Sequence, residues 1–265
     1  MSMFTIQPTG ADKLSDLKAK YRTTVAAPLD GMWEAFTGMA DHYSIMEGSN
    51  TVGYCAVNGE KKMLQFFMSA PASASAAFKQ VIGQLNVVGA IVSTAETAFL
   101  GHCMDYQTSV SEHAIMYHVE DGAACADAKF PADTTFRSLK SPDLQTAVDF
   151  AVATLGADAG WLKSYFGDLI TRSELFGLLG NDGLIATGEC RPSHTQFGFA
   201  DVGMIVGTSH RGKGIATNML RQLIRESTAQ GLKPICSTEH GNIPAQKAIT
   251  KAGFTNYHRI LEITF

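Results

Sequence analysis

Apolar residues recur along the second half of the chain with two different periods, and these periods predict its secondary structure. The segments that read as strands are residues 136–139, 174–179, 184–190, 197–206, 233–236 and 257–264. Apolar positions at helical spacing predict helices at residues 141–151, 215–229 and 243–251. The expected order, which includes a second helix between residue 151 and the strand at 174–179, is β-α-α-β-β-β-α-β-α-β. It describes an α/β (α+β) fold, with a mixed, mostly antiparallel sheet and helices on both faces.

The first half of the chain carries a fainter copy of this pattern. Residues 87–94 resemble residues 232–238. The turn at residues 57–60 is matched with the hairpin signal Asn181-Asp182-Gly183. Similar segments in the same order predict a tandem duplication of one αβ unit.

A small, polar, turn-rich segment separates the two halves. Residues 121–135 read DGAACADAKFPADTT, whereas both flanks carry periodic apolar patterns. This shift in composition is typical of a linker. We therefore predict one domain at residues 1–125 and another at residues 126–265.

Composition narrows the class of protein. The chain has 265 residues, 45% hydrophobic and 17% charged, which fits a folded globular protein. Its formal net charge is -4 and its cations are scattered, so we expect neither a nucleic-acid partner nor a membrane partner. Five cysteines without a CxxC pair predict neither a zinc site nor a disulfide framework. Because the N-terminus does not resemble a signal peptide, we expect a cytoplasmic protein.

The candidate chemistry lies in the stretch GTSHRGKGIATNML, which begins at Gly207 and places glycines and cations before a predicted helix. A P-loop is disfavoured, because Gly214 stands where that motif needs a hydroxyl to hold Mg²⁺. A dinucleotide fingerprint is also disfavoured, because Thr217 replaces the third small residue. Backbone N–H groups in a turn of this kind can bind a pyrophosphate without a metal.

The segment Arg211-Gly-Lys-Gly-Ile-Ala216 resembles the coenzyme A motif of the GCN5-related N-acetyltransferase (GNAT) superfamily. Asn242-x-x-Ala245, followed by Lys251-Ala-Gly-Phe254, resembles the second motif of that family. The two motifs stand in the family's order and cover the second half of the chain. The first half, in which Pro71 follows the apolar segment Leu64–Met68 and lacks an N–H donor, would be a degenerate or substrate-shaping copy.

The resemblance implies an N-acetyltransferase that transfers an acetyl group from acetyl-CoA, its co-substrate, to a primary amine without a metal. The acceptor would be a small molecule or a peptide, and a homodimer stays open. Asp201 is the first candidate for the catalytic base and Glu189 the second. The implied cofactor-binding residues are Met204, Ile205, Val206, Arg211, Gly212, Lys213, Gly214, Ile215, Ala216, Thr217 and Asn242.

One position departs from the family's pattern. Ile249 stands where a tyrosine often protonates the departing thiolate, and isoleucine has no proton to donate. Tyr257, His240 and Ser237 are the alternative donors within sequence reach. This departure also motivates a second hypothesis, in which the chain is a non-catalytic acyl-CoA sensor or scaffold module.

Overall fold

The computed structural model describes residues 4–122 and 126–265, and these form two compact units. Unit 1 holds the described residues up to Met116 together with Tyr257–Phe265, and unit 2 holds those of Tyr117–Asn256. The predicted boundary between residues 125 and 126 falls at the edge of the segment outside the described residues, which also contains Cys125.

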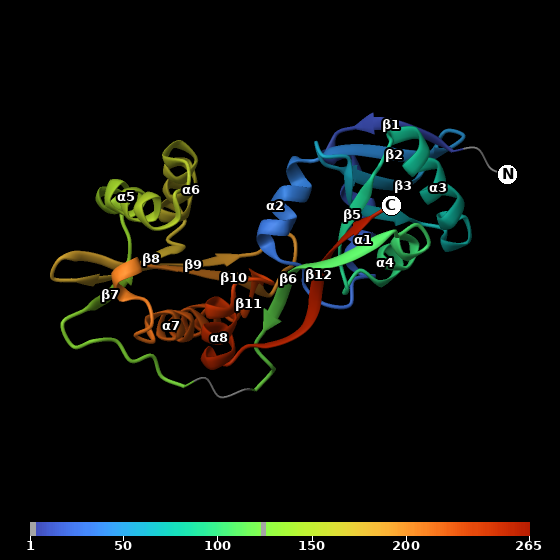
Figure 1. The fold of residues 1–265 in the computed structure, drawn as a ribbon. Coiled ribbons are helices and arrows are strands. Elements are labelled where there is room, and N and C mark those ends of the chain that lie inside the picture. The colour runs from blue at the N-terminus through green and yellow to red at the C-terminus, as the bar shows by residue number, and fades with distance from the viewer. Residues whose placement is uncertain (1–3, 123–125) are drawn as a thin grey trace. The chain divides into compact units, whose positions relative to one another are not determined.

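The chain repeats one order of elements twice, and the elements are labelled in Figure 1. The first series is β1 (Thr5–Thr9), α1 (Ser15–Arg22), α2 (Gly31–Met39), β2 (Asp41–Glu47), β3 (Asn50–Val57), β4 (Lys62–Met68), α3 (Ala74–Leu85), β5 (Gly89–Ser93), α4 (Thr97–Met104) and β6 (Ser109–His118). The second is β7 (Thr135–Ser138), α5 (Leu144–Leu155), α6 (Ala159–Thr171), β8 (Leu175–Gly180), β9 (Gly183–Pro192), β10 (Phe199–Val206), α7 (Ile215–Ala229), β11 (Lys233–Glu239), α8 (Ile243–Ala252) and β12 (Thr255–Thr264). The predicted order and the duplication are confirmed.

One predicted correspondence between the halves is wrong. The turn at residues 57–60 connects β3 to β4, whereas the Asn181-Asp182-Gly183 hairpin connects β8 to β9. By element order, the counterpart of that hairpin is the β2–β3 turn, where Gly48 has a positive φ of 59° and Gly183 has one of 117°. Both are tight turns between apolar strands, so local composition did not distinguish them.

The sheet of unit 1 has the strand order β1-β2-β3-β4-β5-β12-β6, and that of unit 2 has the order β11-β10-β9-β8-β7. The β4–β5 and β10–β11 pairs are parallel, and the neighbouring registers are antiparallel. The last strand, β12, lies in the sheet of unit 1, where Ile260 pairs with Ser93 and Leu261 with Val92. Unit 1 therefore needs the C-terminal strand to complete its sheet.

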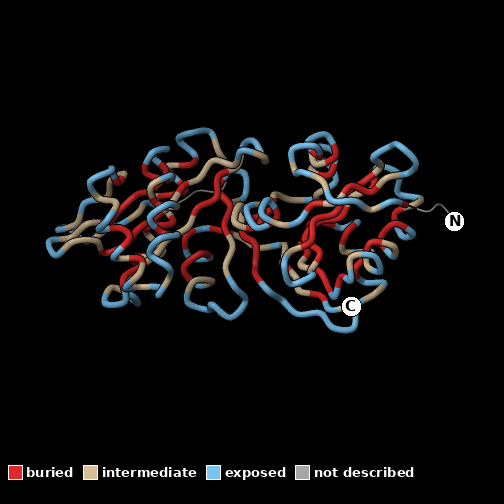
Figure 2. The backbone as a smooth tube through the Cα atoms, turned by 90° about the horizontal axis from the view of Figure 1, so that it is seen from above, coloured by how far each residue is buried: buried red, intermediate tan, exposed pale blue. Residues whose placement is uncertain are grey.

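Each unit has a hydrophobic core on both faces of its sheet, because side chains alternate along each strand. In unit 1, Met63 of β4 packs with α3 and α4 on one face, while Leu64 packs with α1 and α2 on the other. In unit 2, helices α5 and α6 cover one face and α7 covers the other. Figure 2 shows buried backbone, in red, running through the interior of each unit. No helix among the described residues has the length and apolar character of a membrane span.

Candidate functional site

A cleft opens in unit 2 where the parallel strands β10 and β11 separate. Their register runs from Phe199 to Asp201 and ends there, although β10 stays paired with β9 as far as Val206. The second half of β10 therefore presents one backbone edge to the cleft. An unpaired edge of this kind offers N–H and C=O groups to a ligand.

The alternation of the antiparallel β9–β10 pair shows which groups face the cleft. Gly207 N–H donates to Ile185 O at 3.0 Å, so the odd-numbered residues of β10, including Ile205, direct their main-chain groups towards β9. Those of Met204 and Val206 face the cleft, and Arg211 Nε donates to Val206 O at 3.3 Å. The side chain of Ile205 packs against the core under α5 and α6.

The glycine-rich turn joins β10 to α7. Gly212 and Gly214 have φ angles of 75° and 77°, a left-handed conformation that favours glycine over residues with a Cβ. Gly214 is the N-cap of α7, and Asn218 N–H donates back to its carbonyl at 3.1 Å. The N–H groups of Ile215, Ala216 and Thr217 precede the first intrahelical donor and have no intrahelical acceptor.

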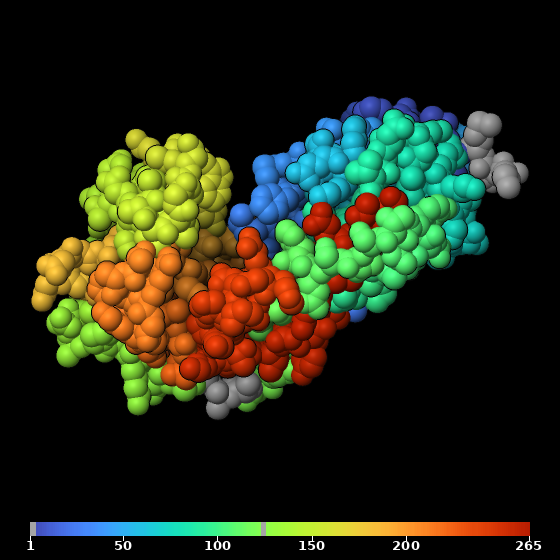
Figure 3. All heavy atoms as spheres, viewed as in Figure 1, coloured from blue at the N-terminus to red at the C-terminus, as the bar shows by residue number. Residues whose placement is uncertain are grey.

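The electrostatics of this turn suit an anion. The dipole of α7 places partial positive charge at its N-terminus, and the cations Arg211 and Lys213 lie in the exposed turn in front of it. Figure 3 shows α7 and α8, in orange and red, on the outer surface of unit 2. Residues 211–214 are exposed, so a pyrophosphate could reach the turn from solvent.

The cleft has a volume of about 660 Å³, which is within the usual range for small-molecule sites. Its walls are the free half of β10, the glycine-rich turn, the start of α7, the end of β11 and α8. The predicted binding residues that line it are Met204, Ile205, Val206, Arg211, Gly212, Gly214, Ile215, Ala216, Thr217 and Asn242. Lys213 is exposed and lies outside this lining.

Of the two candidate bases, Glu189 lies in the wall of the cleft. It pairs in register with Gly203, and a Cβ added at Gly203 would meet Glu189 Oε1 at 2.5 Å. The absence of a side chain at Gly203 therefore lets the carboxylate of Glu189 lie over β10. The hydroxyl of Tyr165 in α6 donates a hydrogen bond to Glu189, and Arg191 Nε lies 3.6 Å from Oε2 of Glu189.

Asp201 has a different environment. It is buried, lies outside the cleft lining, and its Oδ1 is 4.0 Å from Nη2 of Arg191. The guanidinium of Arg191 thus lies between both carboxylates. Arg191 was not among the predicted site residues, although period-two alternation along β9 places it on the same face as Glu189.

Tyr165, which contacts the carboxylate of Glu189, forms a stacked pair with a second aromatic residue of α6. Trp161 is half exposed and stacks on Tyr165, with ring centroids 5.0 Å apart and an interplanar angle of 11°. Burial and the neighbouring Glu189 carboxylate raise the pKa of Tyr165 well above its ordinary value, so its hydroxyl stays protonated. A stacked aromatic pair beside a carboxylate can bind an organic cation. Phe166, by contrast, is buried in the core.

Ile249 is buried and lines the cleft, so an apolar side chain stands in the structure where the family often has a tyrosine. Among the alternative donors, Ser237 lines the cleft, whereas His240 lies outside the lining and Tyr257 belongs to unit 1. Within residues 4–122 and 126–265, no three or more His, Cys, Asp or Glu side chains gather as a metal site would need.

Comparisons with known proteins agree with this fold. Family models described as acetyltransferase (GNAT) domain match residues 10–120 and 130–255. A GNAT-family acetyltransferase from Colwellia psychrerythraea is 37% identical, covers 98% of this chain and 99% of its own, and superposes with a TM-score of 0.91.

Two more distant structures share the fold alone. A GCN5-related N-acetyltransferase from Sphaerobacter thermophilus is 12% identical, with a TM-score of 0.68 over 98% of this chain and 94% of its own. A tandem GNAT protein from the clavulanic acid biosynthesis pathway is 12% identical, with a TM-score of 0.63 over 98% of both chains. A search among curated proteins found no match.

Proposed function

Because the chain belongs to the GNAT family of acetyltransferases, we propose that unit 2 binds acetyl-CoA and transfers its acetyl group to a primary amine of a small molecule or peptide. The observation that carries the proposal is the cleft between β10 and β11, which joins a left-handed glycine turn to a backbone edge and a carboxylate. The two domains then differ in role, with unit 2 holding the co-substrate.

The residues of the cleft divide the binding task. The N–H groups at the start of α7 and the cation Arg211 would bind the pyrophosphate. The main-chain groups of Met204 and Val206 would pair with the pantetheine amides and donate to the carbonyl oxygen as it becomes negative. Asn242, at the N-terminus of α8, would contact the arm from the opposite wall.

The transfer itself needs a proton acceptor. The amine nitrogen forms a bond to the carbonyl carbon, the carbon–sulfur bond breaks, and the thiolate leaves with the electron pair and takes up the second proton that the nitrogen loses as the amide forms. Glu189 would take the proton of the incoming ammonium, and Tyr165 and Arg191 would hold its carboxylate in place. Asp201 would act indirectly, because its carboxylate would hold the guanidinium of Arg191 in place. Ser237 would donate a hydrogen bond to the departing sulfur.

A second candidate function is acyl-CoA binding without turnover, which the apolar side chain of Ile249 favours. The two functions share the cleft and differ in whether free thiol is released. A screen for thiol release across a panel of primary amines distinguishes them.

The first experiment is calorimetric titration of acetyl-CoA into the wild type and into Gly214→Glu. The glutamate would fill the turn and repel the pyrophosphate, so we expect a loss of affinity of at least about 100-fold. Gly83→Glu is the matched control, because Gly83 is exposed in α3 of unit 1 and has open space around it. Undiminished binding to a folded Gly214→Glu variant would refute the assignment of the turn.

A further inference from the structure

Unit 1 contains a cavity of about 470 Å³ in the place that corresponds to the cleft of unit 2. Its walls come from the end of β4, the start of α3, helix α4 and Tyr21 of α1. The register of the parallel β4–β5 pair ends at Met63, so these strands also separate. The duplicated fold has therefore kept an opening here, and its chemistry has changed.

The cavity is not suited to a phosphate. The segment after β4 carries Pro71, which has no N–H, where unit 2 has its glycine-rich turn. None of the residues that line this cavity is a lysine or an arginine. Burial lowers the pKa of His102, so this imidazole is neutral at pH 7.

The walls are aromatic. Phe66 and His102 meet edge to face with centroids 5.6 Å apart, and Tyr21 meets Phe67 in the same way at 6.3 Å. Phe99 completes this set, and Phe66, Phe99 and Tyr21 are all buried. Aromatic faces of this kind attract both apolar groups and organic cations.

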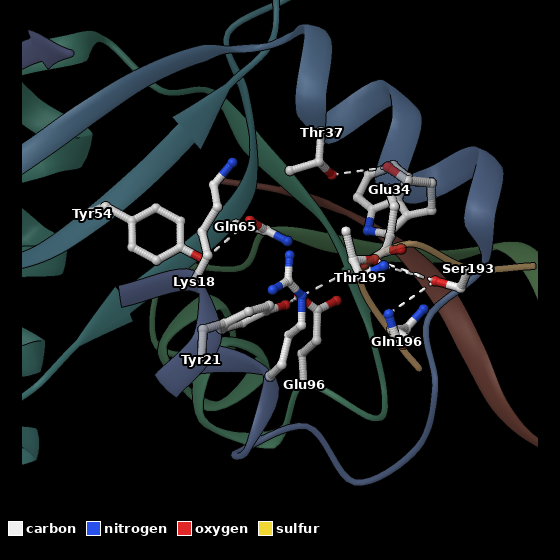
Figure 4. Close-up of polar contacts among 12 residues, drawn as sticks. Lys18, Tyr21, Glu34, Thr37, Tyr54, Gln65, Glu96, Ser193, Thr195 and Gln196 are labelled. Carbon is white, nitrogen blue, oxygen red and sulfur yellow. Dashed lines mark hydrogen bonds and ion pairs between the residues drawn. The ribbon is translucent and has the colours of Figure 1, made fainter. Parts of the chain in front are cut away.

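A buried carboxylate stands at the wall of the cavity. Glu96 is 3% exposed, accepts a hydrogen bond from the hydroxyl of Tyr21, and accepts another from Ser93 N–H at 2.6 Å. Figure 4 shows the contact between Tyr21 and Glu96, and beside it the hydrogen bond from the Tyr54 hydroxyl to Gln65. Each carboxylate oxygen of Glu96 thus has one donor and can accept another.

Glu96 occupies the position equivalent to Asn242. Each is the N-cap of the helix that follows the parallel strand, with φ and ψ of -93° and 62° for Glu96 and -85° and 67° for Asn242. Asn242 caps its helix by accepting from Ala245 N, whereas the side chain of Glu96 makes no cap hydrogen bond. Its carboxylate is directed to Tyr21 and Ser93 instead. With Asp105 at the edge, the ionisable wall groups favour a cation.

We propose that the cavity of unit 1 binds a small primary amine with an apolar body, its ammonium paired with Glu96 and its body between Phe66, Phe67 and Phe99. The volume fits a molecule smaller than coenzyme A. Burial favours the protonated form of Glu96, and a bound ammonium would supply the opposite charge that favours its carboxylate, whose oxygens already accept from Tyr21 and Ser93. This site is distinct from the cleft of unit 2 and does not require that unit 2 bind acetyl-CoA.

The test uses three probes of similar size and different charge, titrated without acetyl-CoA and followed by ligand-observed NMR. Phenethylamine carries the ammonium, phenethyl alcohol is neutral and phenylacetate is an anion. We expect phenethylamine to bind at least about tenfold more tightly than phenylacetate, with the alcohol between them. Equal affinity for the amine and the anion, or no binding of the amine to the folded protein at millimolar concentration, would overturn the proposal.

Variants locate the bound probe. Gly101→Phe would fill the cavity from α4, where a Cβ meets nothing within 4 Å, and should reduce phenethylamine binding at least about tenfold. Gly83→Phe is the matched control, because it adds the same side chain to a helix glycine outside the cavity lining. Ser75→Trp, at an exposed lining position, repeats the test if Gly101→Phe does not fold.

Glu96→Gln tests the charge. It keeps the shape of the side chain, so a loss of at least about tenfold for phenethylamine with no loss for the alcohol is the expected result. If Gly101→Phe and Ser75→Trp leave amine binding intact while Trp161→Ala abolishes it, the amine binds in unit 2 and the proposal is wrong.

Discussion

The openings of unit 1 and unit 2 occupy the same place in a duplicated fold and present opposite chemistry. In unit 2 the turn after the central strand has left-handed glycines and cations, and the N-cap of α8 is the neutral Asn242. In unit 1 the corresponding turn holds Pro71, the N-cap is the acidic Glu96, and the walls are aromatic.

This difference separates what the fold supplies from what the side chains supply. The parting of two parallel strands is common to both units, since the registers end at Met63 in one and at Asp201 in the other. An opening is therefore a property of the topology, whereas the charge of its ligand depends on a few residues at its rim. A duplicated domain can keep the opening and change the ligand.

The largest expected effect concerns the base of unit 2. Glu189→Gln removes the proton acceptor from the cleft wall, and we expect kcat to fall roughly 100-fold or more, with acetyl-CoA affinity unchanged. Rates would be measured with the best amine from the thiol-release screen. The comparison variant is Asp201→Asn, which should lower kcat less, because Asp201 lies outside the cleft lining. The reverse order of effects would assign the base to Asp201.

The next effect concerns the carboxylate of unit 1. Burial raises the pKa of Glu96 from its ordinary 4.5 to about 7, against the opposing hydrogen bonds from Tyr21 and Ser93. The folded state keeps this proton to higher pH than the unfolded state. The contribution of Glu96 to the free energy of unfolding is therefore complete below pH 4.5 and is lost as the pH rises to about 7. This pKa shift corresponds to a contribution of up to about 3 kcal/mol to the free energy of unfolding.

Glu96→Gln should remove this pH dependence. The measurement is denaturant unfolding at several pH values in a Trp161→Phe background, in which Trp33, packed in the core near Tyr21, is the one remaining tryptophan. We expect the stability of the Glu96 protein relative to Glu96→Gln to fall between pH 4.5 and pH 7. A constant difference across that range would show that Glu96 titrates normally.

Much of the fold of unit 2 could be predicted because its elements have strong local signals. The hairpin at Asn181-Asp182-Gly183, the amphipathic helix after Gly214 and the end of α8 at Gly253 each follow from turn and capping chemistry within a few residues. The glycine-rich turn could also be found, because its conformation requires particular residues.

The remaining features depend on distant residues. The insertion of β12 between β5 and β6 pairs residues far apart in sequence, and nothing in the composition of β12 specifies that partner. The contact between Tyr21 and Glu96 joins residues 75 positions apart. The position of Glu189 over Gly203 follows from the register of β9 and β10. Periodicity predicts that an element forms, but pairing in the folded sheet decides what its side chains meet.

The smallest expected effect tests the rim residue that differs between the two units. Asn242→Asp would place at the cleft of unit 2 the kind of charge that unit 1 carries at Glu96. Aspartate is as good an N-cap as asparagine, so the stability of α8 should not decrease. The added charge is exposed, and we expect acetyl-CoA affinity to fall only about fivefold, with a larger loss at low ionic strength.

Asn58→Asp is the matched control, because Asn58 also accepts main-chain hydrogen bonds through its side chain, from Glu60 N–H and Lys62 N–H, but lies in unit 1. Calorimetry at two salt concentrations measures both variants. A loss confined to Asn242→Asp and weakened by salt would mean that the residue at this N-cap helps to select the charge of the ligand. An equal affinity for acetyl-CoA in both variants would instead assign the selectivity of unit 2 to the glycine-rich turn alone.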